Sequence, residues 1–89
     1  MYVIDYITPD GCGHIILAAT EADAAKGMGK AFAEMRLPPE LAIDAGYLVS
    51  LYLKAQGRAA MVIQGITLRP ISQKSFESWT RALFPSPQQ

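Results

Sequence analysis

Cysteine, charge and long apolar runs are scarce in this sequence of 89 residues. The single cysteine, Cys12, excludes an intrachain disulfide, so the fold depends on packing and nothing indicates an oxidising compartment. Charged residues make up only 18% of the chain against 51% hydrophobic residues, which excludes the charge-rich composition of disordered proteins. The longest apolar run, around Gly46 to Leu53, is far shorter than the roughly 20 residues of a membrane-spanning helix, so we expect no membrane partner.

The start and the length of the chain predict one cytoplasmic domain. The segment before Thr8 carries Asp5 and no basic residue, which is unlike a signal peptide. A chain of this size supports a single hydrophobic core. We therefore expect residues 1–84 to form one domain and residues 85–89, which are polar and broken by proline, to form a flexible C-terminal tail.

The first half of the chain has the pattern of a hairpin followed by a helix. Residues 2–8 and 13–19 have the β-branched and aromatic content of strands, and the Pro-Asp-Gly sequence of residues 9–11 is typical of a hairpin turn. Thr20 then has the character of a helix N-cap. Apolar residues recur at steps of three and four up to about Arg36, where two consecutive prolines follow and end the predicted helix.

Residues 47–71 allow two interpretations. In one, a short helix ends at Gly46 and a second hairpin follows, with Gly57 in its turn and Gly65 in the fourth strand as a bulge or a site of close backbone approach. In the other, residues 40–56 form one helix, because their polar side chains cluster on one side at helical spacing. We favour the hairpin, since Gly46 would cost about 1 kcal/mol inside a helix.

The last helix completes the predicted fold. It begins at Ser72 or Ser75, and its spacing turns Phe76, Trp79 and Leu83 towards the core. The sequence thus predicts a small two-layer α+β domain in ββα-ββα order. Its four-stranded antiparallel sheet would have two main helices packed on one face. The strand order does not follow from the sequence.

The only histidine, His14, lies two residues after Cys12, and the turn before them decides what stands opposite. A two-residue loop would place Asp5 on the face of Cys12 and His14, an arrangement with the composition of a thiol catalytic triad. A type I turn with a glycine bulge pairs Thr8 with Cys12 and Tyr6 with His14, and moves Asp5 to the other face. We favour the bulged turn, because proline suits its first position. We therefore predict no catalytic residue, no metal and no cofactor.

Charge is distributed unevenly, although the net charge is zero. The chain up to Ala45 has seven acidic and three basic residues, and the rest has one acidic and five basic residues. Such asymmetry indicates association with an anionic partner or between copies of the protein. The predicted partner-binding residues belong to the basic half, and they are Lys54, Arg58, Arg69 and Lys74.

These observations predict a non-enzymatic module that binds another protein. Small size and a lack of recognisable motifs are typical of inhibitors or accessory proteins of phages and mobile elements, such as anti-CRISPR proteins. A homodimer, formed through a sheet edge or through the complementary charged halves, is a further expected form. Two alternatives are kept. One is a nucleic-acid-binding domain using the basic half, which a sequence pI near 6.5 disfavours, and the other is a thiol or metal site at Cys12 and His14.

Overall fold

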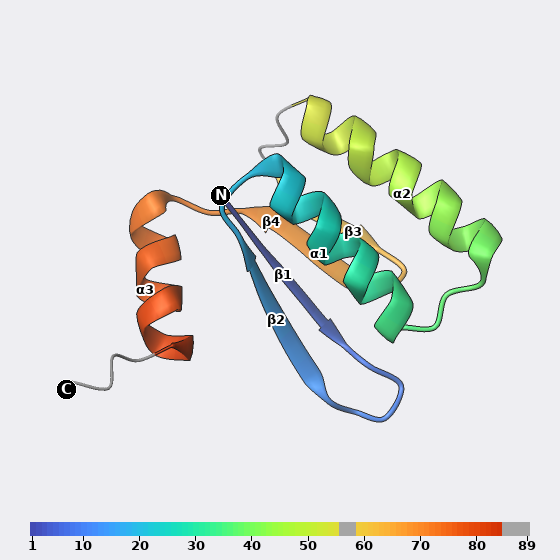
Figure 1. The fold of residues 1–89 in the computed structure, drawn as a ribbon, viewed down its shortest axis with the longest axis horizontal. Coiled ribbons are helices and arrows are strands. Elements are labelled where there is room, and N and C mark those ends of the chain that lie inside the picture. The colour runs from blue at the N-terminus through green and yellow to red at the C-terminus, as the bar shows by residue number, and fades with distance from the viewer. Residues whose placement is uncertain (56–58, 85–89) are drawn as a thin grey trace.

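A computed structural model describes residues 1–55 and 59–84 of the chain as a four-stranded sheet with three helices (Figure 1). Along the chain the elements alternate in the predicted ββα-ββα order, with one additional long helix between the two halves. In that order they are β1 (Tyr2–Ile7), β2 (Gly13–Ala18), α1 (Glu21–Glu34), α2 (Pro39–Lys54), β3 (Met61–Ile63), β4 (Ile66–Pro70) and α3 (Gln73–Leu83). The α+β class and the four-stranded antiparallel sheet are therefore confirmed.

The sheet has the strand order β2-β1-β4-β3, and every neighbouring pair is antiparallel. In the first hairpin, Tyr6 pairs with His14, as the bulged turn requires. The backbone N–H of Thr8 donates to the carbonyl of Cys12 at 2.9 Å, and Gly11 has a positive φ of 88°. The predicted register is confirmed, because the Pro-Asp-Gly turn determines it locally.

Helix α1 begins at the predicted N-cap and packs closely on the sheet. The Thr20 side chain accepts a hydrogen bond of 3.1 Å from the backbone N–H of Asp23. Near the middle of the helix, a Cβ atom added to Gly27 would lie 2.6 Å from Ile4 Cδ1 and 3.1 Å from Ile16 Cγ2. Glycine at this position thus lets the helix approach β1 and β2.

Helix α2 contradicts the preferred interpretation of the middle of the chain. Residues Pro39–Lys54 form one helix, so the prediction of a strand after Gly46 is wrong and the alternative is right. Ala45, Val49 and Leu53 recur every four residues and are buried in the core. Burying such side chains contributes roughly 1.5 to 3 kcal/mol for each Val or Leu, which outweighs the cost of about 1 kcal/mol for one glycine inside a helix.

The second hairpin is shorter than predicted and turns at a different place. Strands β3 and β4 are joined by Gln64 and Gly65, whose φ angles of 51° and 79° are both positive, as a two-residue type I′ turn requires. Gly65 therefore belongs to the turn, and its predicted place inside the fourth strand is wrong. Gly57, the predicted turn residue, lies outside the described residues.

The core lies between α1, α2 and one face of the sheet. Ile4, Ile66 and Leu68 of the sheet are fully buried, and Met28 of α1 is 1% exposed. No helix among residues 1–55 and 59–84 combines the length and the apolar character needed to cross a bilayer. The buried members of the core are Tyr2, Ile4, Tyr6, Ala18, Ala24, Met28, Ala31, Phe32, Ala45, Val49, Leu53, Ile66 and Leu68.

Helix α3 lies beside β2, at the side of the sheet away from α2 (Figure 1). The Ser72 side chain caps it by accepting a hydrogen bond of 3.1 Å from the backbone N–H of Ser75, so the first of the two predicted caps is right. Phe76 and Trp79 are half-buried, whereas Leu83 is exposed, contrary to its predicted place in the core.

Candidate functional site

The predicted basic site is spread over different elements. Lys54 lies in the last turn of α2, Arg69 on β4, and Lys74 in the first turn of α3. Lys54 lines a groove between α1 and α2, while Lys74 lines a separate hollow along α3. Arg58 lies outside the described residues. No hydrogen bond or ion pair among residues 1–55 and 59–84 joins the three described side chains.

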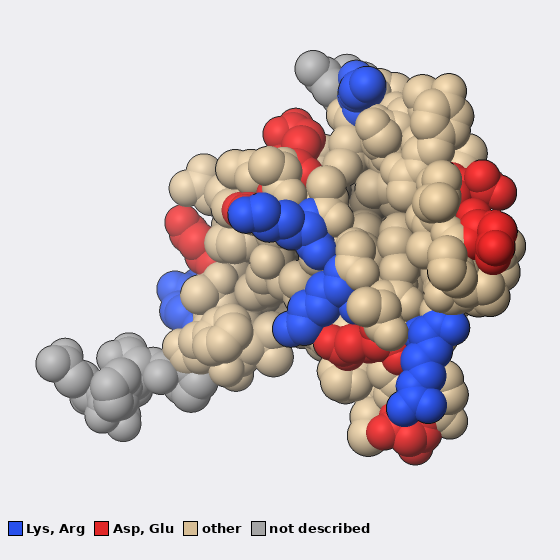
Figure 2. Space-filling view, turned by 45° about the vertical axis from the view of Figure 1, so that its right-hand side comes forward, with Lys and Arg blue, Asp and Glu red and all other residues tan. Residues whose placement is uncertain are grey.

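The basic side chains visible on one face of the molecule are likewise spread over separate places. Figure 2 shows lysine and arginine side chains scattered over this face, with acidic side chains and uncharged surface between them. Phosphate recognition favours basic residues clustered on one face or along one helix. The arrangement of Lys54, Arg69 and Lys74 is therefore not that of a continuous basic surface.

Cys12 and His14 of the first hairpin do not share a face of the sheet with Asp5, as the two-residue loop would require. Because Asp5 pairs with Ile15, it lies on the face opposite His14. Cys12 is a free and exposed thiol. Over the part of the chain that the structure describes, no three His, Cys, Asp or Glu side chains come together as metal ligands.

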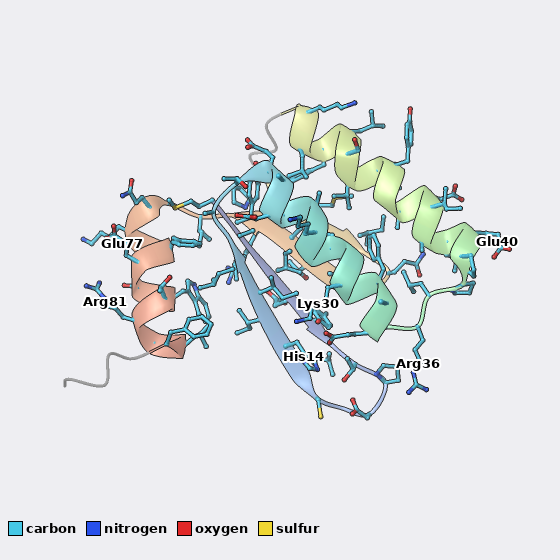
Figure 3. The ribbon with its side chains drawn as sticks, in the orientation of Figure 1. His14, Lys30, Arg36, Glu40, Glu77 and Arg81 are labelled. Carbon is cyan, nitrogen blue, oxygen red and sulfur yellow. The ribbon has the colours of Figure 1, made fainter. Side chains whose placement is uncertain are left out.

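A different carboxylate, which the sequence pattern does not predict, lies beside His14. Glu34 Oε2 lies 3.6 Å from His14 Nδ1 and accepts a hydrogen bond of 2.7 Å from the Tyr6 hydroxyl. The rings of Tyr6 and His14 stack with their centroids 5.1 Å apart. Lys30 Nζ lies 4.0 Å from the other oxygen of Glu34, and Figure 3 shows Lys30 and His14 near each other at this end of the molecule.

The chemistry of this cluster, Tyr6, His14, Lys30 and Glu34, is that of a structural link between α1 and the hairpin. Burial, the hydrogen bond to Glu34 and the charge of that carboxylate together raise the pKa of Tyr6 to about 12. The phenol therefore stays protonated and continues to donate at neutral pH. Glu34 is thus engaged in holding the last turn of α1 to the sheet.

Helix α2 carries an apolar surface on its solvent side. Ile43 is 72% exposed, Tyr47 65% and Leu51 46%, and these three recur every four residues along the helix. At 3.6 residues per turn, they lie on the side opposite the buried Val49. We call the exposed apolar side of this helix the outer face of α2, and it consists of Leu41, Ile43, Tyr47, Leu48 and Leu51.

The groove between α1 and α2 adjoins this outer face. It encloses about 360 Å³, and Met28, Phe32, Val49 and Leu53 give it an apolar lining. Lys54 lines the groove at the C-terminal end of α2. Glu21 and Ser50 also line the groove, so its apolar lining has a polar border.

The face of the sheet opposite the core also exposes apolar side chains, but they do not form a continuous surface. Ile15 and Val62 are exposed there, at the two ends of one row of paired residues across the sheet. Polar residues lie between them, so the row is not a continuous apolar surface. In order across the sheet the row is Ile15, Asp5, Thr67 and Val62.

No protein-family model matches the chain, and no curated protein or solved structure is similar enough to match it. Among the surfaces described above, the outer face of α2 departs furthest from what a solvated helix presents to water.

Proposed function

We propose that this chain is a non-enzymatic protein-binding module and that the outer face of α2 is its contact surface. The observation that carries the proposal is the set of large apolar side chains on the solvent side of one helix, centred on Tyr47. Soluble monomers rarely expose large contiguous apolar patches, and those that do generally use them for binding.

The composition of the outer face suits protein contact in particular. Tyr47 offers a large ring with a polar hydroxyl, the kind of side chain that contributes most to protein interfaces. Ile43 and Leu51 lie one turn before and one turn after it. Apolar residues at this spacing are the anchors by which a helix docks on a groove or on another helix.

The kind of protein expected from the sequence is compatible with this contact surface. A single small domain that acts by contact would suit an inhibitor or accessory protein of the phage or mobile-element type. The site that we propose for this role is the outer face of α2, with Lys54 at its edge, in place of the larger basic set predicted from the sequence.

Capture of a partner by matched variants tests the proposal. Immobilised wild type is compared with Tyr47→Lys and with Ile7→Lys, because Tyr47 and Ile7 are 65% and 66% exposed and only Tyr47 is on α2. The protein captured from the native host is identified by mass, purified and tested again with each variant. We expect Tyr47→Lys to weaken binding by roughly tenfold or more, and Ile7→Lys to leave it unchanged.

Two outcomes would overturn this function. Equal binding by wild type and Tyr47→Lys would remove the outer face of α2 as the contact surface. Loss of binding in Ile7→Lys alone would assign the contact to the face of the sheet opposite the core. Unchanged circular dichroism of both variants is the control for folding.

A further inference from the structure

The outer face of α2 is complementary to itself when two helices run in opposite directions. With Tyr47 of one copy opposite Tyr47 of another, Ile43 comes opposite Leu51 of the second copy, because both lie four residues from Tyr47. Two-fold symmetry produces the same contact twice, as isologous dimers require. Apolar side chains then meet apolar side chains along the centre of the contact.

The charges at the two ends of the helix fit the same register. Glu40 lies in the first turn of α2 and Lys54 in the last turn, each seven residues from Tyr47. At 100° per residue, both lie within about 20° of Tyr47 around the helix axis. An antiparallel pair therefore places each Glu40 opposite Lys54 of the second copy, and it also aligns the helix dipoles favourably.

These end charges form no ion pair in the part of the chain that is described, although Lys54 lines the groove between α1 and α2 together with Glu21. Neither Glu40 nor Lys54 has an ion-pair partner among residues 1–55 and 59–84. Figure 3 shows Glu40 at the far end of α2, pointing away from the rest of the molecule. Asp44 lies on the flank of the contact, where the register places Ser50 of the second copy.

We propose that the partner of the outer face of α2 is a second copy of this chain, packed antiparallel through α2. The inference rests on the proposed function, since it names the protein that the contact surface binds. A parallel pair would instead bring Glu40 against Glu40 and Lys54 against Lys54. Charge complementarity therefore selects the antiparallel arrangement.

The size of the contact predicts a weak dimer. A helix of 16 residues is about 24 Å long at a rise of about 1.5 Å per residue. One pair of such helices lies at the small end of interface sizes, below about 1,200 Å². We expect a dissociation constant in the micromolar range, which analytical ultracentrifugation over a series of concentrations measures.

Charge reversal at the two ends tests the register. Glu40→Lys leaves two lysines facing each other at both ends of the pair, and Lys54→Glu leaves two glutamates. Each is expected to raise the dissociation constant by roughly five- to thirtyfold. The double variant Glu40→Lys/Lys54→Glu restores opposite charges and is expected to recover dimerisation. An equimolar mixture of the two single variants is expected to form the heterodimer.

Matched charge reversals elsewhere are the controls. Lys26→Glu on the exposed side of α1 and Glu77→Lys on α3 make the same changes of charge away from the outer face, and we expect the dimer to be unaffected. A dimer that responds equally to all four single variants would overturn the register, as would failure of the mixture to form heterodimers.

Failure of this inference differs from failure of the proposed function. A wild-type chain that is monomeric at all concentrations would overturn the second copy as partner. If Tyr47→Lys still abolished capture of another protein, the outer face of α2 would remain the contact surface. A dimer that persists in Tyr47→Lys would place the self-contact on another part of the molecule and overturn the inference.

Discussion

The two neighbouring helices α1 and α2 differ in the residues that they expose to solvent. The exposed side of α1 consists of charged residues such as Lys26 and Lys30 and of small residues such as Ala33. The exposed side of α2 carries Tyr47 and Leu51 in its middle, with charges towards its ends. Both helices bury one side in the same core, so the core alone does not explain the difference. The solvent side of α1 is thus that of an ordinary surface helix, whereas α2 exposes a second apolar side that a binding partner could bury.

The helices also differ in what their polar groups do. At the end of α1, Glu34 accepts a hydrogen bond from Tyr6 and lies beside His14, so its charge serves the fold. On α2, Glu40 and Lys54 have no ion-pair partner within the described residues. The polar groups at the end of α1 therefore contact the rest of the domain. We propose that those at the ends of α2 contact a second copy of the chain.

The largest predicted effect concerns the inward contact of α1. Gly27→Val would place a branched side chain against Ile4 and Ile16, and we expect the free energy of unfolding to fall by about 2 kcal/mol through overpacking. Gly29→Val is the matched control, because nothing lies within 4 Å of a Cβ atom there. Urea denaturation measures both variants, and equal losses would contradict the close approach of α1 to the sheet.

A smaller effect is predicted at the polar end of α1. Because the folded-state pKa of Tyr6 is raised from 10.0 to about 12, the protonated phenol stabilises the fold fully below pH 10. This contribution is lost as the pH rises towards 12. The unfolding free energy of wild type is expected to approach that of Tyr6→Phe by about 1 kcal/mol between neutral pH and about pH 11.

The Tyr6→Phe variant is also the control for other groups that titrate in this range. Burial and nearby charge raise the pKa of Tyr2 and Tyr52 as well, and these phenols are present in both proteins. Only the difference between the two proteins reports on Tyr6. A difference that stays constant with pH would contradict the raised pKa of Tyr6, which burial and the contact with Glu34 together produce.

The sequence predicted those parts of the fold that local chemistry determines. The Pro-Asp-Gly turn and the Thr20 cap each act over three or four residues and are found as predicted, and Ser72 is the cap of the two serines that the sequence allowed. The failure at Gly46 has the opposite cause. A local penalty for glycine argued against a helix there, but the burial of Val49 and Leu53 depends on distant residues of the sheet and of α1.

The candidate sites were less predictable for the same reason. Glu34 meets His14 only because α1 runs back along the hairpin for about 20 Å, which is also the length of a strand of six residues. The equal lengths of the predicted helix and strands were the one feature of the sequence that could have predicted this contact. The outer face of α2 was hidden by the strand interpretation, since only a helix leaves Tyr47 and Leu51 together on the solvent side.

Disulfide trapping at the centre of α2 tests the outward contact most directly. In a Cys12→Ser background, which removes the native thiol, Tyr47→Cys is compared with Lys26→Cys on the exposed side of α1. In the antiparallel pair the two cysteines at position 47 face each other. We therefore predict covalent dimers from Tyr47→Cys under mild oxidation, formed many times faster than from Lys26→Cys. Equal rates for the two variants would contradict the proposal that α2, and not α1, makes the contact.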